Sequence, residues 1–145
     1  MAERSDEMIP DDVKQSLRDT FFNTLESDVA IEVYTMAGMN DQYNEATSAL
    51  IRSLAGLSDK IKVSFHTIGD AQSVKRNVTR SPSVLIAPDK YGMRYTGSPL
   101  GEEGRSLIVG MLMASTGKSA LTEPSLKRLA TLQEKRHIQV YISPT

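Results

Sequence analysis

The amino-acid sequence predicts an α/β protein with a mixed central four-stranded β-sheet flanked by helices. Short alternating stretches rich in β-branched residues indicate strands, and the segments between them carry apolar residues at helical spacing. The first two strands are joined through a helix and should be parallel, whereas the next two are separated by a short turn and should be antiparallel. The 145 residues, 39% of them hydrophobic, are enough for one packed domain.

The first half of the chain is predicted as helix, strand, helix and strand. Residues 10–26 begin with Pro10, which suits a first helical turn, and carry apolar residues at every fourth position, so we expect an extra N-terminal helix. Residues 29–35 (VAIEVYT) and 61–68 (IKVSFHTI) alternate as strands do. Between them, residues 42–57 read as a helix, and its predicted buried residues are Ala46, Ala49, Leu50, Leu54 and Leu57.

The second half is predicted as a short helix, a hairpin and further helices. A weak helix at 71–78 precedes the buried strand 83–87, and residues 91–96 read as the hairpin partner of that strand. A helix follows over 102–114, and another starts after Thr122. We expect a last strand over residues 137–142 (HIQVYI), which alternates but has no element after it to pack against.

Charge and composition exclude several classes of function. Basic and acidic residues number 17 and 18, which argues against a nucleic-acid groove or a polybasic membrane surface. No apolar run approaches the length of a membrane span, and the N-terminus lacks a secretion signal, so we expect a cytoplasmic protein. The chain has no cysteine, which removes disulfides and thiolate metal sites. His66 and His137 have no clustered acid beside them, and we expect neither a metal nor a cofactor.

Three segments resemble a known family. Residues 32–63 (EVYTMAGMNDQYNEATSALIRSLAGLSDKIKV), 80–86 (RSPSVLI) and 92–115 (GMRYTGSPLGEEGRSLIVGMLMAS) are similar to the first unit of the glutaredoxin-like protein disulfide oxidoreductases, which carry two thioredoxin folds in tandem. The turn at 97–101 resembles the N-terminal domain of the flavoprotein subunit of alkyl hydroperoxide reductase. The resemblance covers about residues 10 to 145 and implies a thioredoxin-like fold for residues 10–136.

One departure from the family bears on redox function. The family's Cys-x-x-Cys falls on Asp41-Gln42-Tyr43-Asn44, so Asp41 and Asn44 stand at degenerate dithiol positions. A dithiol works there because the helix N-terminus stabilises the attacking thiolate and the second cysteine resolves the mixed disulfide. Neither Asp41 nor Asn44 can exchange electrons, and we expect this half to have no redox activity.

The same positions have two readings. The simpler one makes Asp41 a helix cap and Asn44 a polar residue of the first turn. The other is a recognition site beside Pro82, because the resemblance implies a cis-proline whose preceding residue offers backbone groups to an extended peptide. The candidate peptide-binding residues are Ser81, Pro82, Gln42 and Tyr43.

Residues 137–145 resemble the first strand of the family's second thioredoxin fold, whose Cys-x-x-Cys would follow Thr145. Either the chain is a fragment cut before that dithiol, or the domain never had one, and the unfinished strand favours a fragment. We expect this exposed strand to pair between molecules, and a homodimer is one form that such pairing takes.

Three hypotheses about function follow. The first is a redox-inactive domain that serves as the structural and docking half of a thiol–disulfide oxidoreductase, with a second thioredoxin-like domain as its partner and a peroxiredoxin as a partner of the parent protein. The alternative is a free-standing protein-binding module that recognises an extended peptide beside Pro82. A third, a cysteine-independent enzyme at Asp41, lacks an acid–base pair.

Overall fold

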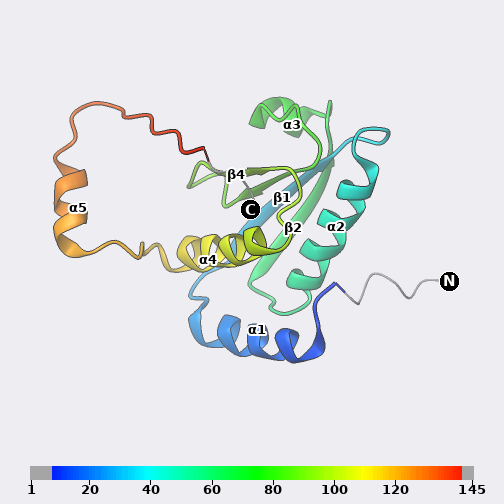
Figure 1. Cartoon of the computed structure of the whole chain (residues 1–145), viewed down its shortest axis with the longest axis horizontal. Helices are drawn as coiled ribbons and strands as arrows, with labels where there is room; N and C mark the ends of the chain where they lie inside the picture. Colours follow the sequence, from blue (N-terminus) through cyan, green and yellow to red (C-terminus); the bar gives the residue numbers. More distant parts are fainter. Residues whose placement is uncertain (1–7, 142–145) are drawn as a thin grey trace.

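A four-stranded sheet in the order β2-β1-β3-β4 forms the centre of the computed structural model, which describes residues 8–141 (Figure 1). The strands are β1 (Val29–Thr35), β2 (Ile61–Thr67), β3 (Ser83–Ile86) and β4 (Met93–Thr96). The helices are α1 (Asp11–Thr24), α2 (Asp41–Ala55), α3 (Ala71–Arg76), α4 (Glu102–Thr116) and α5 (Glu123–Ala130).

Strand β1 is central and has a partner strand on each side. It runs parallel to β2, with Ile31 opposite Val63, and antiparallel to β3, with Ile31 opposite Ile86. Strand β4 then pairs antiparallel with β3. The mixed sheet predicted from the element order is therefore confirmed, including the extra helix before the first strand.

The two faces of the sheet are covered unequally. The main core lies on the face formed by Val29, Ile31 and Val33, which is packed by α1, α2 and α4. The opposite face carries a smaller cluster of Tyr34 and Leu85 with residues flanking α3. Because side chains alternate along a strand, neighbouring residues of β1 serve the two different faces.

The buried face of α2 differs from the one expected. Leu54 is buried as predicted, but Asn44, Thr47 and Ile51 complete the face, while the predicted Ala46, Ala49, Leu50 and Leu57 are only partly buried. The polar residues tolerate burial because each has a hydrogen-bond partner: Thr47 donates to Ser98 Oγ at 2.8 Å, and Asn44 is treated below.

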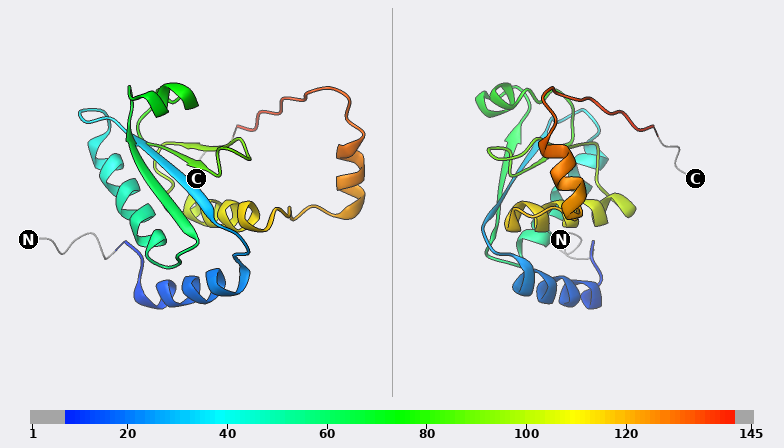
Figure 2. Two further views of the ribbon diagram at one scale, coloured as in Figure 1. Left: turned by 180° about the vertical axis from the view of Figure 1, so that it is seen from behind. Right: turned by 90° about the vertical axis from the view of Figure 1, so that its left-hand side faces the viewer.

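The end of the described chain does not match the prediction. Helix α5 has no buried residue and lies apart from the sheet in Figure 1 and in the left-hand view of Figure 2. Residues 137–141 form no strand, and Ile138 and Val140 are 84% and 79% exposed. The strand predicted over residues 137–142 is wrong for residues 137–141, whose backbone has no partner strand among the described residues. Residue 142 lies outside the described residues.

Candidate functional site

The loop from β1 into α2 is shaped by residues 36–41. The amide of Gly38 donates to Asp41 Oδ1 at 2.8 Å, and the amide of Met39 donates to the Met36 carbonyl at 3.2 Å. Asn40 adopts a left-handed conformation with φ of 60°, which asparagine tolerates better than most residues. Asp41 therefore closes the loop on its N-terminal side. It does not cap the amides of α2, although the simpler reading expected that it would.

Asn44 lies at the centre of a closed hydrogen-bond network. Its Nδ2 donates to the carbonyls of Met36 and Met39 at 3.0 and 2.8 Å. Its Oδ1 accepts from the hydroxyl of Ser81 at 2.7 Å, and that hydroxyl accepts from the Met36 amide, also at 2.7 Å. The Asn44 side chain thus uses both its donor and its acceptor groups, which is what a buried amide requires.

The segment before β3 completes the site. The Ser81-Pro82 peptide bond is cis, as the family resemblance implies. The Ser81 carbonyl accepts from Asn40 Nδ2 at 2.8 Å, and the Pro82 carbonyl accepts from the Gly97 amide at 2.9 Å. Ser81 is therefore held through its hydroxyl and its carbonyl by the loop that leads into α2.

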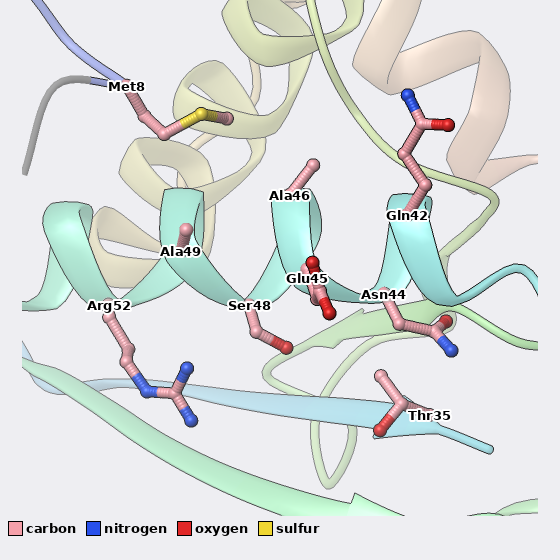
Figure 3. A pocket seen from close by; sticks show the side chains of 9 residues that line it. All are labelled: Met8, Thr35, Gln42, Asn44, Glu45, Ala46, Ser48, Ala49 and Arg52. Carbon is pink, nitrogen blue, oxygen red and sulfur yellow. The ribbon is translucent and has the colours of Figure 1, made fainter. Parts of the chain in front are cut away.

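The structure brings some of the predicted site residues together and leaves others apart. Asp41 Oδ1 lies 3.5 Å from Asn44 Nδ2, and Asn44 contacts Ser81 directly. Gln42 points away from the sheet, on the opposite side of α2 from Asn44 (Figure 3). Tyr43 is 53% exposed. The site is a cluster of Asp41, Asn44, Ser81 and Pro82, with Gln42 and Tyr43 on the surface beside it.

A surface hollow runs along α2 next to this cluster. It has a volume of about 600 Å³, with Asn44 and Thr35 at one end and Arg52 at the other (Figure 3). The guanidinium carbon of Arg52 lies 4.3 Å from the centre of the Phe65 ring, a cation–π arrangement that fixes the basic end of the hollow. The volume of the hollow suits part of an extended peptide, and its polar groups offer hydrogen bonds.

The chemistry available at this cluster is hydrogen bonding. Within residues 8–141 there is no group of three or more His, Asp or Glu residues that is arranged to hold a metal ion. No helix of that part of the chain is long and apolar enough to cross a membrane. With no cysteine in the sequence, the cluster has no thiol for disulfide exchange.

Sequence reasoning missed a polar cluster on the opposite face of the sheet. Glu32 accepts hydrogen bonds from Arg76 Nη2 at 2.8 Å, from Gln72 Nε2 at 3.1 Å and from Tyr34 Oη at 2.5 Å. Arg76 also pairs with Asp89 at 2.9 Å. The signal was present in the sequence, because an acidic residue in the middle of a central strand needs a buried partner.

This cluster shifts pKa values in opposite directions. Burial acts to raise the pKa of Glu32, but the hydrogen bonds from Arg76, Tyr34 and Gln72 and the charge of Arg76 outweigh it, so the Glu32 pKa lies below its usual range. Burial, together with the neighbouring carboxylate of Glu32, raises the pKa of Tyr34 far above its usual value. Glu32 is thereby kept charged and Tyr34 neutral.

Comparisons with solved structures support the fold described above. A protein disulfide oxidoreductase from Aeropyrum pernix superposes with a TM-score of 0.72 at 22% identity, over 85% of this chain and 55% of that one. The alkyl hydroperoxide reductase protein AhpF from Enterococcus faecalis superposes with a TM-score of 0.73 at 21% identity, over 87% of this chain and 62% of that one. The fold is thioredoxin-like.

Sequence comparisons lead to similar proteins. The chain is 28% identical over 138 residues to the alkyl hydroperoxide reductase protein AhpF from Staphylococcus epidermidis, a match that covers 95% of this chain. It is 27% identical over 125 residues to an NADH dehydrogenase of Bacillus subtilis, a match that covers 86% of this chain. The chain spans only 25% and 22% of the lengths of these two relatives. No family model matches the chain.

Proposed function

We propose that this chain is a redox-inactive thioredoxin-like domain that acts as the structural and docking half of a thiol–disulfide oxidoreductase. One observation carries the proposal. At the helix start where the glutaredoxin-like protein disulfide oxidoreductases have their dithiol, Asn44 is committed to hydrogen bonds with the Met36 and Met39 carbonyls and with Ser81. The chain retains the thioredoxin-like architecture and replaces the reacting thiols by groups that cannot be oxidised and reduced.

The network supports a role in holding shape. A thioredoxin dithiol must remain accessible so that its thiolate can attack a disulfide. The attacking position is taken by Asp41, which is exposed but has no thiol, and the resolving position by Asn44, which is 8% exposed and hydrogen-bonded to Ser81, itself 5% exposed. A rigid, fully hydrogen-bonded loop preserves a recognition surface but carries out no exchange chemistry, which is what a docking half requires.

The sequence of residues 137–145 supports a second unit. Ile138-Gln139-Val140-Tyr141 repeats the pattern of Ile31-Glu32-Val33-Tyr34 in β1, and each stretch follows a helix. Ile31 and Val33 are almost completely buried in the core of the first unit. We therefore propose that residues 137–145 begin a second thioredoxin fold in which Ile138 and Val140 become buried, and that residues 10–136 are the first.

The relatives supply the proposed partners. Because AhpF proteins of alkyl hydroperoxide reductase are among them, we propose that the parent protein works with a peroxiredoxin. A second thioredoxin-like domain, the one that residues 137–145 would begin, is the direct partner of this chain. Its dithiol would carry the electrons, while this half would hold and orient it.

A second candidate function is a free-standing module that binds an extended peptide beside Pro82. The hollow of about 600 Å³ next to Asn44 favours it. In this reading Gln42 and Tyr43, which lie on the surface beside the cluster, contact the peptide side chains. A homodimer formed through residues 137–142 would be one source of such a peptide.

Two measurements on the chain test these proposals. The reduction of insulin by dithiothreitol is followed with and without the chain, and the two rates should match; catalysed reduction would overturn redox inactivity. Backbone amide NMR shifts are then followed as a purified thioredoxin-like domain bearing Cys-x-x-Cys, or an extended peptide, is added. Docking predicts saturable shifts with the domain, whereas shifts confined to residues 40–44, 81 and 83 with the peptide alone favour the second function.

A further inference from the structure

A small polar cavity lies on the α3 face of the sheet, between the segment leading into β3 and strand β4. Its volume is about 230 Å³, and it is lined by Thr79, Arg80, Ser83, Arg94 and Thr96. Ser83 and Thr96 lie directly opposite each other in the β3–β4 register. The lining contains two guanidinium groups, three hydroxyls and no carboxylate, so the groups that converge on the cavity are suited to an anion.

Arg94 is held in place before any ligand arrives. Its Nη1 donates to the Asn77 carbonyl at 2.9 Å, and its Nη2 donates to the Arg76 carbonyl at 2.6 Å. A guanidinium has five N–H donors, so these two bonds leave donors available. Because the C-terminal end of α3 fixes the group, less side-chain entropy is lost when it binds an anion.

Arg80 has no ion pair or hydrogen bond from its side chain to any residue within 8–141. Its backbone is fixed, since the Ser83 hydroxyl donates to the Arg80 carbonyl at 2.7 Å. Of the carboxylates near α3, Asp70 caps the start of the helix, and Glu32 and Asp89 both pair with Arg76. The charge of Arg80 is therefore not compensated by these neighbours.

The sequence around Arg80 and Arg94 is rich in basic residues. Residues 75–94 contain five basic residues and one acidic residue, in a chain whose net charge is −1. The basic residues are Lys75, Arg76, Arg80, Lys90 and Arg94. Glu32 and Asp89 compensate the charge of Arg76, and the positive charge that remains raises the concentration of anions near the cavity.

We propose that this cavity binds a phosphate group, as free phosphate or as a phosphate monoester. The planar guanidiniums of Arg80 and Arg94 suit the oxygens of a tetrahedral dianion, to which arginine donates paired hydrogen bonds. The hydroxyls of Thr79 and Thr96 supply further donors at the rim. The cavity lining shares no residue with the Asn44 network, and the site does not depend on the function proposed above.

Titration of the whole chain with inorganic phosphate tests this site. Backbone amide shifts are recorded at constant ionic strength, with chloride replaced stepwise by phosphate, and parallel titrations use phosphoserine and sulfate. We expect saturable shifts centred on residues 79–83 and 94–96. Tighter binding of phosphoserine than of phosphate identifies a monoester as the source, and the reverse identifies the free ion. Shifts that spread over the basic surface without saturating would overturn the proposal.

Arg80→Gln is the decisive variant, because Arg94 also holds the carbonyls at the end of α3 and its loss would disturb the fold. Removal of a charged donor should weaken phosphate binding by about tenfold or more. Arg105→Gln, on α4 outside the cavity, is the matched control and should leave the affinity unchanged. Equal affinity in Arg80→Gln and wild type would mean that the cavity is not the binding site.

Discussion

The hydroxyl of Ser81 lies 2.7 Å from Oδ1 of Asn44 and donates a hydrogen bond to it. This contact joins the residue before the cis peptide bond to the first turn of α2, two segments that are 37 residues apart in sequence. The resemblance to the glutaredoxin-like protein disulfide oxidoreductases implies that the same two segments frame a dithiol in those proteins. Here they frame a hydrogen-bonded amide, and the account of function rests on that replacement.

Loss of the Asn44 amide should destabilise the domain. Asn44→Ala leaves the Met36 and Met39 carbonyls and the Ser81 hydroxyl without their partner, so we expect the free energy of unfolding to fall by about 2 kcal/mol. Asn44→Asp, which keeps the shape but turns acceptor oxygens toward the two carbonyls, should also be destabilised. Urea denaturation of both variants measures the loss in free energy of unfolding, and Glu45→Ala serves as the control at an exposed position. Wild-type stability in Asn44→Ala would show that the network is not structural.

The pair of Glu32 and Arg76 should be more sensitive than a surface ion pair. Both side chains are largely buried, with 11% and 13% exposed, so Arg76→Met leaves a buried carboxylate without its charge partner and should cost about 3 kcal/mol. The double variant Glu32→Met/Arg76→Met removes both charges and should recover part of that loss. Thermal or urea unfolding of wild type, the single variant and the double variant measures these losses of stability. A double variant as unstable as the single one would mean that the cost does not come from the unpaired charge.

The stability of the domain should depend on pH through Glu32. Its pKa in the folded state is below the ordinary value of 4.5, so the folded state binds this proton less readily than the unfolded state. The stabilisation is complete above pH 4.5 and is lost as the pH falls through the lowered pKa. Urea unfolding between pH 3 and pH 7 should show a smaller acid-induced loss in Glu32→Gln than in wild type. Identical pH profiles would rule out Glu32 as the source.

Removal of residues 137–145 should leave the domain folded. Residues 137–141 pair with no described strand, and their side chains are exposed, so the loss of these five residues takes no contact from the core. We expect the melting temperature to stay within a few degrees of that of the whole chain, as measured by circular dichroism. Any self-association seen by light scattering should weaken in the shortened chain. If the shortened chain failed to fold, these residues would have to belong to the first domain.

The sequence predicted the sheet well because its signals are local. The alternation of VAIEVYT and the apolar spacing of the helices depend on neighbouring residues, and the order of elements limits the pairing of strands. Two features escaped prediction because they depend on distant partners. The burial of Asn44 requires Ser81, and the burial of Glu32 requires Arg76, and neither pairing is visible in a single sequence. The strand over 137–142 failed for residues 137–141 because alternation alone does not make a strand, and these residues have no partner strand among the described residues.

The register of the degenerate dithiol is the central claim, and a pair of cysteines tests it directly. In Asp41→Cys/Asn44→Cys the sulfur atoms replace the Cγ carbons of two side chains that already meet, with Oδ1 and Nδ2 3.5 Å apart, so mild oxidation should close an intrachain disulfide. Gln42→Cys/Asn44→Cys is the matched control, because those side chains point to opposite sides of α2 (Figure 3). Thiol titration after oxidation should find no free thiol in the first variant and two in the control. Two free thiols in monomeric Asp41→Cys/Asn44→Cys would contradict the account.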